Sequence, residues 1–152
     1  MINKDEPYLI EYNIRMGDPE CQVIMMRLKT DLLEIIDSII NNKLNNIKIK
    51  WSKKNSITIV LCAKGYPLNY LKNSEIKNLS KIKLDDSNQI FHAGTYSKNN
   101  KIYSNGGRVL NITSCSESLV KARNNSLSNI NKINWKDGFF RKDIGWKAIK
   151  NS

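Results

Sequence analysis

The sequence has little of what marks secreted, metal-clustered or membrane-spanning proteins. It contains one histidine and three cysteines, Cys21, Cys62 and Cys115. The cysteines are odd in number, widely spaced and without a C-x-x-C pair, which argues against a disulfide framework and a zinc site. No apolar run is long enough to cross a membrane. The N-terminal residues contain no apolar stretch typical of a secretory signal, so we expect a cytoplasmic protein with no membrane partner.

Arginine is scarce in a chain that is otherwise strongly basic. Lysine and arginine total 25 against 14 aspartates and glutamates, a formal net charge of +11, yet only five of these residues are arginines. Proteins that read nucleic acids depend on arginine for bidentate contacts. The lysines here are scattered among asparagines, and Lys, Asn and Ile together make up 62 residues, a bias typical of AT-rich coding DNA. We therefore do not expect nucleic acid as a partner.

The first third of the chain predicts one strand and two helices. Residues 7–14 are rich in β-branched and aromatic side chains that alternate loosely, as in a strand. Asp18 then offers an N-cap for a helix. Apolar residues recur at spacings of three and four through residues 28–44, which predicts a second, amphipathic helix capped by Thr30.

Strands dominate beyond a boundary that we place near Lys54. Residues 56–63 form a continuous β-branched run, and a second strand begins within residues 89–95. The Asn-Gly-Gly in the middle of residues 101–114 separates two strand-like arms. Because these residue types tolerate positive φ, this pattern predicts a hairpin.

A helix follows the predicted strands. Ser114 and Glu117 have the spacing of a capping box, and apolar residues continue at helical spacing to about Ile133. Strands followed by a helix indicate the α+β class. A length of 152 residues fits one domain, or one small domain joined to a piece of another.

Candidate functional side chains gather in the predicted N-terminal strand. Glu11, Asn13 and Arg15 would project to the same face, because side chains alternate with period two along a strand. A carboxylate and an amide oxygen, roughly 7 Å apart along the backbone by the strand rise, could share a Mg²⁺ ion. Arg15 could hold a phosphoryl oxygen with its planar fork. The alternative is an exposed strand face with a Glu–Arg ion pair.

Three later positions allow two interpretations each. His92 could act as a general base, or it could be a hydrogen-bonded packing residue in an apolar strand. Arg108 could contact a ligand or merely follow a hairpin turn. Residues 139–146, FFRKDIGW, fit a tail that docks on a neighbouring element as well as a ligand contact.

The order and separation of several segments indicate a family. The segments are IEYNIRMGDPECQVIMMRLKTDLLEI, GYP, FHAGT, NGGRVL and FFRKDIGWKA, between Tyr8 and Ala148. Together they resemble the C-terminal part of the phosphoribosylamine-glycine ligases, also called glycinamide ribonucleotide synthetases, which are ATP-grasp enzymes. The resemblance implies that residues 1–54 form the tail of an ATP-grasp domain. Residues 55–152 would then be a small, β-rich C-terminal domain with a packed helix.

The resemblance also implies an activity and its cofactors. Enzymes of this family join glycine to 5-phosphoribosylamine through a glycyl phosphate, with ATP hydrolysed to ADP and phosphate, in de novo purine synthesis. The positions matching Glu11 and Asn13 bind Mg²⁺ or Mn²⁺ in the family. A divalent metal offsets the charge of ATP phosphates and positions them for attack.

The resemblance also implies roles for four further residues. Arg15 and Asp18 match positions at the reaction centre, and Arg108 and His92 match positions of the C-terminal domain that faces the substrates. The sequence departs from the usual family pattern where Lys64 precedes Gly65, where Met16 stands in place of Phe and where Lys147 follows Trp146. These departures weaken the transfer of fine substrate contacts and leave the metal ligands in place.

Members of the family are nearly three times as long as this chain. The regions that hold ATP and most of the phosphoribosylamine pocket precede the part that resembles this sequence. We therefore expect the chain to be incomplete and inactive alone, with a separate polypeptide as the possible source of the N-terminal and ATP-grasp regions. The alternatives are a non-catalytic basic binding module and an inactive fragment of the ligase.

Overall fold

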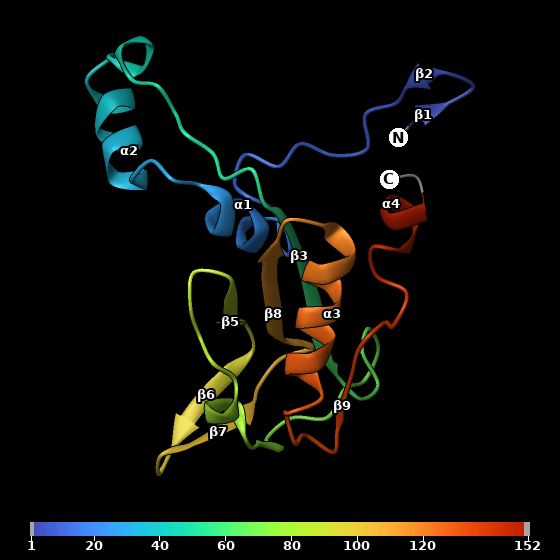
Figure 1. Ribbon diagram of the computed structural model, residues 1–152. Coiled ribbons are helices and arrows are strands. Elements are labelled where there is room, and N and C mark those ends of the chain that lie inside the picture. Colours follow the sequence, from blue (N-terminus) through green and yellow to red (C-terminus); the bar gives the residue numbers. More distant parts are fainter. Residues whose placement is uncertain (1, 151–152) are drawn as a thin grey trace.

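The computed structural model describes residues 2–150, whose arrangement is shown in Figure 1. The helices are α1 (Cys21–Arg27), α2 (Leu32–Ile40), α3 (Leu119–Ile130) and α4 (Trp146–Lys150). The strands are β1 (Ile2–Asn3), β2 (Glu6–Pro7), β3 (Asn55–Ala63), β4 (Glu75–Ile76), β5 (Asn88–His92), β6 (Thr95–Lys98), β7 (Lys101–Ser104), β8 (Arg108–Ser116) and β9 (Gly138–Phe139). Helices and antiparallel sheets together confirm the predicted α+β class. Among these residues, no helix is both long and apolar enough to span a membrane.

A four-stranded antiparallel sheet with the order β5-β8-β3-β9 forms the centre of the molecule. Its long strands β3 and β8 pair from Asn55 and Ser116 at one end to Leu61 and Leu110 near the other. Every second residue of β3 is buried, because successive side chains point to opposite faces of a sheet. A three-stranded sheet with the order β4-β7-β6 continues beyond one end of the main sheet (Figure 1).

Helix α3 packs against β3 and β8 on one face of the main sheet (Figure 1). The hydrophobic core consists of Ile59, Leu61, Ala63, Ile76, Val109, Leu110, Ile112, Ile130 and Trp135. On the other face, the hydroxyl oxygens of Thr58 and Thr113 lie 2.7 Å apart. Helix α1 reaches that face, where the Cys115 thiol donates to the Met26 carbonyl over 3.8 Å.

The predicted strand at residues 7–14 is wrong. Residues 8–14 belong to none of the strands of the described residues and lie in a segment whose apolar side chains are exposed. A strand needs a neighbour for its backbone hydrogen bonds, and here only the two-residue strands β1 and β2 pair with each other. The side chains of this segment do alternate as they would in a strand. Among the described residues, however, no neighbouring strand completes a sheet with it.

The two N-terminal helices form, with caps other than those predicted. Helix α1 begins at Cys21, and Asp18 does not cap it. Helix α2 is shorter than residues 28–44, and Asp31 is its cap, since the Asp31 carboxylate accepts from the Leu33 amide at 2.8 Å. The Thr30 hydroxyl instead accepts from the Lys50 amide at 2.7 Å.

The predicted hairpin within residues 101–114 is also wrong. Strands β7 and β8 form and lie where expected, but they belong to different sheets. Residues 105–107 carry the chain from one sheet to the other, and neither Gly106 nor Gly107 has a positive φ. The glycines serve close packing, described below, rather than a tight turn.

Strand β3 agrees with the prediction for residues 56–63, and residues 89–95 contain β5 and the start of β6. The predicted helix after β8 is α3, but its cap is Ser118, whose hydroxyl accepts from the Lys121 amide at 3.2 Å. Ser114, the predicted cap, lies within β8 instead. Strand β8 continues because both of its neighbours, β3 and β5, pair with it there.

Candidate active site

Arg108, the first residue of β8, joins the C-terminal part of the chain to the segment that precedes α1. Its Nη2 lies 3.1 Å from Oδ2 of Asp18, and its Nη1 donates to the Asp18 carbonyl at 2.6 Å. Both side chains are a little more than a third exposed. Two predicted site residues, one from each part of the chain, are therefore in direct contact at a position that solvent and a ligand can reach.

Glycines allow the backbone around Arg108 to pack unusually closely. The Gly94 amide donates to the Arg108 carbonyl at 3.1 Å, and the Asn105 amide donates to the Gly94 carbonyl at 2.8 Å. A Cβ at Gly94 would lie 2.7 Å from both the Arg108 oxygen and the Gly106 Cα. Such distances leave no room for a side chain, so the FHAGT and NGGR segments meet only because these residues are glycines.

The GYP segment packs against the place where the FHAGT and NGGR segments meet. A Cβ at Gly107 would lie 2.3 Å from a ring carbon of Tyr66, so the Tyr66 ring fills the space in which a side chain would stand. The rings of Tyr66 and Tyr70 are 6.4 Å apart, which adds an aromatic contact beside this crossing. The packing of its ring thus fixes Tyr66 beside the residue that precedes Arg108.

A cavity of about 430 Å³ lies beside Arg108. It is lined by Pro19, Thr58, Val60, Cys62, Tyr66, Pro67, Arg108, Phe139, Phe140, Arg141 and Ile144. Thr58, Val60 and Cys62 are alternate residues of β3 on the face opposite the core. The remaining wall comes from four of the segments singled out in the sequence. A mainly apolar hollow of this size with a few polar groups is typical of a ligand site.

Each arginine in the cavity wall already has a carboxylate partner. Arg141 donates to Asp143 through Nε at 3.0 Å and Nη2 at 2.6 Å. These hydrogen bonds hold the pKa of the Asp143 carboxyl below its usual value and raise the pKa of Arg141. Arg108 contacts the Asp18 carboxylate through Nη2 alone, at 3.1 Å. An anionic group that binds here must therefore share a guanidinium with a carboxylate or displace it.

Cys62 is the one thiol in the wall of this cavity. Burial raises the pKa of Cys62, and the nearby positive charge of Arg108 partly opposes this effect. A raised pKa keeps the thiol protonated and poorly nucleophilic at neutral pH. The cavity therefore does not contain an activated cysteine nucleophile.

Glu11 and Asn13 lie side by side, as the metal hypothesis requires, although not in a strand. The Asn13 Nδ2 donates to Glu11 Oε1 at 2.8 Å, and both side chains are exposed. The Asn13 amide oxygen and the second Glu11 oxygen are hard ligands of the kind that Mg²⁺ prefers. No group of three or more His, Cys, Asp or Glu suited to a metal exists in residues 2–150.

Arg15 and His92 lie outside the cavity wall that the described residues form. Arg15 donates from Nη1 to the Met16 carbonyl at 2.9 Å. His92, at the end of β5, has its Nδ1 2.9 Å from the Thr95 hydroxyl. Both side chains are exposed, and their predicted roles at a reaction centre stay predictions.

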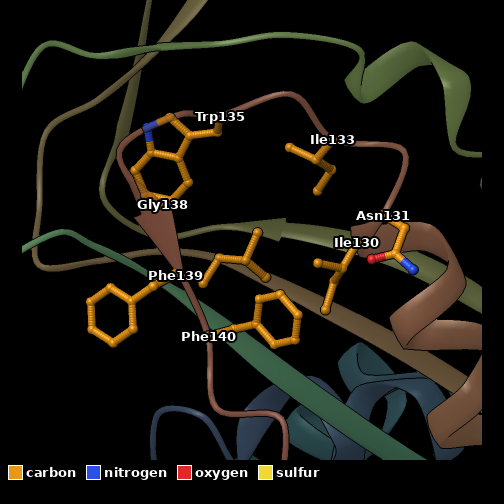
Figure 2. Close-up of a pocket in the computed structure, with 8 residues that line it drawn as sticks. Ile130, Asn131, Ile133, Trp135, Gly138, Phe139 and Phe140 are labelled. Carbon is orange, nitrogen blue, oxygen red and sulfur yellow. The ribbon is translucent and has the colours of Figure 1, made fainter.

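The cavity residues that sequence reasoning missed are Thr58, Val60 and Cys62 of β3, whereas Phe139 and Phe140 belong to the segment that the sequence singled out. Phe139 and Phe140 line the cavity, and they also line a second hollow of about 250 Å³ with Ile130 and Trp135. Figure 2 shows their rings on opposite sides of the backbone, with Phe140 facing Ile130. The alternation of β3 could have predicted that Thr58, Val60 and Cys62 share a face, but not what covers that face.

The chain matches known proteins along nearly its whole length. Residues 56–147 match the family model described as phosphoribosylglycinamide synthetase, C domain. The chain is 43% identical over 150 residues to the phosphoribosylamine–glycine ligase of Brucella melitensis, covering 99% of this chain and 35% of that protein. It is 46% identical over 146 residues to the ligase of the same name from Fusobacterium nucleatum, covering 95% and 34%.

A solved structure is also similar. The crystal structure of a phosphoribosylamine–glycine ligase from Thermotoga maritima matches with a TM-score of 0.71 and 29% identity, over 94% of this chain and 34% of that one. The chain thus spans about a third of the length of these relatives.

Proposed function

Because the chain belongs to the phosphoribosylglycinamide synthetase family, whose C-domain model matches residues 56–147, we propose that it forms the C-terminal part of a phosphoribosylamine-glycine ligase. The complete enzyme would join glycine to 5-phosphoribosylamine with hydrolysis of ATP, a step of purine synthesis in the cytoplasm. The single observation that carries this proposal is the meeting of four family segments around the Arg108 cavity.

In this proposal Arg108 binds substrate. A guanidinium presents a planar fork that suits a phosphate or carboxylate oxygen. The Asp18 carbonyl accepts from Arg108 and the Asp18 carboxylate forms an ion pair with the same guanidinium, so Asp18 fixes the direction of that fork. Tyr66, and the close packing of Gly94 and Gly106 against the Arg108 backbone, limit how far Arg108 can move. Arg15 at the reaction centre and His92 as a further substrate contact complete the proposed set.

Glu11 and Asn13 are the residues that would hold Mg²⁺ or Mn²⁺ in the complete enzyme. Their paired oxygens offer a small part of an octahedral shell, and ATP phosphates usually supply more of it. When bound, the metal would offset negative charge on those phosphates. The exposed position of both side chains supports this role, because an incoming nucleotide can reach them.

We assign residues 1–54 to the ATP-grasp domain and residues 55–152 to the C-terminal domain. The remaining two thirds of a relative's length would supply the ATP site and most of the phosphoribosylamine pocket, within the same polypeptide or from another. Alone, the 152 residues would not turn over substrate. The match of this chain to only about a third of each relative supports that expectation.

A chimeric enzyme tests the proposal. The 150 matched residues of the Brucella relative are replaced by this chain, and ADP release that depends on both glycine and phosphoribosylamine is measured. We expect the chimera to be active and the 152-residue chain alone to be inactive. A folded chimera without activity would contradict the proposed function, and turnover by the chain alone would contradict its incompleteness.

A further inference from the structure

The segment after β9 forms one wall of the Arg108 cavity. Residues 139–145, here called the strap, contribute Phe139, Phe140, Arg141 and Ile144 to its lining. Figure 1 shows the chain running from β9 along α3 to α4. The strap has no regular structure beyond Phe139, so its position depends on individual contacts.

Arg123 of α3 supplies two of these contacts. Its Nε donates to the Ile144 carbonyl at 2.9 Å, and its Nη2 donates to the Lys142 carbonyl. A charged donor makes a stronger hydrogen bond than a neutral one, and one planar fork can bind two carbonyls at a fixed spacing. Arg123 itself does not line the cavity, so it acts on the site only through the strap.

The two ends of the strap are fixed against β3. Phe139 pairs with Cys62, near the end of β3. At the other end Gly145 has a φ of +80°, and a Cβ there would lie 2.7 Å from the Ile57 side chain. The strap therefore runs along β3 in the opposite direction. Between its two ends, Phe140 and Ile144 pack against the hydrophobic core, and Arg123 adds the hydrogen bonds to the Lys142 and Ile144 carbonyls. The Arg141–Asp143 ion pair lies within the strap and does not fasten it to another element.

We propose that Arg123 is a positioning residue that holds the strap as a movable wall over the Arg108 cavity. Without Arg123, the strap would open from its middle and expose the cavity while the sheet and α3 keep their structure. The importance of this wall for catalysis rests on the proposed function. The structural part of the inference does not.

Cys62 provides a direct probe, because its half-buried thiol lies inside the cavity. The experiment measures the rate at which iodoacetamide modifies each cysteine of the full chain, resolved by mass spectrometry of peptides. Arg123→Met keeps the length of the side chain and removes both hydrogen bonds. Lys121→Met removes a charge from the same helix at an exposed position and is the matched control. Cys115, buried in the sheet, reports global unfolding.

We expect Arg123→Met to raise the rate at Cys62 by about tenfold, as loss of charge-assisted hydrogen bonds would allow. The rate at Cys115 should not change, and Lys121→Met should change neither rate. Arg123→Lys keeps a donor and should restore part of the protection. An unchanged rate at Cys62, or equal increases at Cys62 and Cys115, would overturn the proposal.

The chimera separates this inference from the proposed function. In an active chimera, Arg123→Met should raise KM for a substrate several-fold more than it lowers kcat, because the wall shapes binding. An equal effect of Lys121→Met would overturn the catalytic importance of the strap. If the chimera with native Arg123 is inactive, the proposed function fails, while the Cys62 rates still decide whether Arg123 holds the strap.

Discussion

The guanidinium of Arg108 contacts both the carboxylate and the carbonyl of Asp18, at 3.1 and 2.6 Å, across 90 residues of sequence. One residue begins β8, and the other precedes α1. The contact therefore joins the part of the chain that carries Glu11 and Asn13 to the sheet that carries the cavity. A ligand at Arg108 would act on both parts at once.

Removing this contact should affect the site more than the stability of the fold. Arg108→Ala should cost at most about 1 kcal/mol of unfolding free energy, because the pair is more than a third exposed and solvent screens it. Asp18→Asn should cost less, since the carbonyl contact remains. Chemical denaturation of the two variants measures both values. A loss of several kcal/mol would mean that the pair is structural rather than functional.

Gly107→Ala should destabilise the fold by about 1–3 kcal/mol, as overpacking does. The new methyl group would meet the Tyr66 ring, which is held by the cavity wall. Gly17→Ala is the matched control, because its Cβ would meet only the exposed Glu20 side chain, with the mobile carboxylate at 2.6 Å and the Glu20 Cβ at 3.1 Å. Thermal unfolding of the two variants compares them. Equal melting temperatures would show that Tyr66 can move away freely.

Glu11→Gln should weaken the use of metal by the chimera. Losing a carboxylate ligand should raise the Mg²⁺ concentration needed for half-maximal activity by about tenfold or more, as loss of even supporting groups does in metal sites. Glu6→Gln, an exposed carboxylate in β2, is the control and should have no effect. An unchanged Mg²⁺ requirement for Glu11→Gln would remove this residue from the metal site.

The ion pair within the strap should be lost in acid. The pKa of Asp143 is lowered first by its hydrogen bonds from Arg141. A carboxyl whose folded pKa is lowered stabilises the fold above its ordinary pKa near 3.9, and this contribution is lost as the pH falls through the lower folded value. Carboxyl NMR titration should show this lowered pKa, and Arg141→Met should return it toward the ordinary value. An unchanged pKa in that variant would contradict the assignment.

The apolar residues of α2 should be replaceable without loss of stability. Leu33 and Ile40 are each 73% exposed, so changing both to Lys should alter the unfolding free energy by no more than about 0.5 kcal/mol each. Ile59→Ala, in the core, should cost about 3 kcal/mol. Denaturation curves compare these variants. A large loss in the Lys variant would show that the face of α2 is covered in solution.

The sequence predicts a strand or helix well where the residues of that element alone carry the pattern that identifies it. Residues 56–63 lie within β3 because they are rich in β-branched side chains and pack one face against the core, and the α3 region has a clear helical period. Residues 8–14 fail for the opposite reason. Their alternation describes a strand face, but a strand also requires a neighbour, which local pattern does not reveal.

The sequence predicts the polar residues of the candidate site, but it does not predict the shape of the cavity. The resemblance singled out Asp18 and Arg108, and the fold brings them into contact. The Asn-Gly-Gly at 105–107 predicted a hairpin, because positive φ is the commonest use of such glycines. Here Gly107 instead makes room for Tyr66. Close approach of segments that are distant in sequence leaves no periodic signal, so neither the cavity nor the role of Arg123 could be predicted.

The most direct test of the account is the turnover of the chimera with native Arg108 and with Arg108→Ala, measured as ADP release that depends on glycine and phosphoribosylamine. We predict that the chimera is active and that Arg108→Ala lowers its kcat/KM by about a hundredfold, roughly the 2.7 kcal/mol that a lost charged contact to substrate can cost. Lys121→Met should leave the activity unchanged. An Arg108→Ala chimera as active as its parent would contradict the claim that the Arg108 cavity faces the reaction.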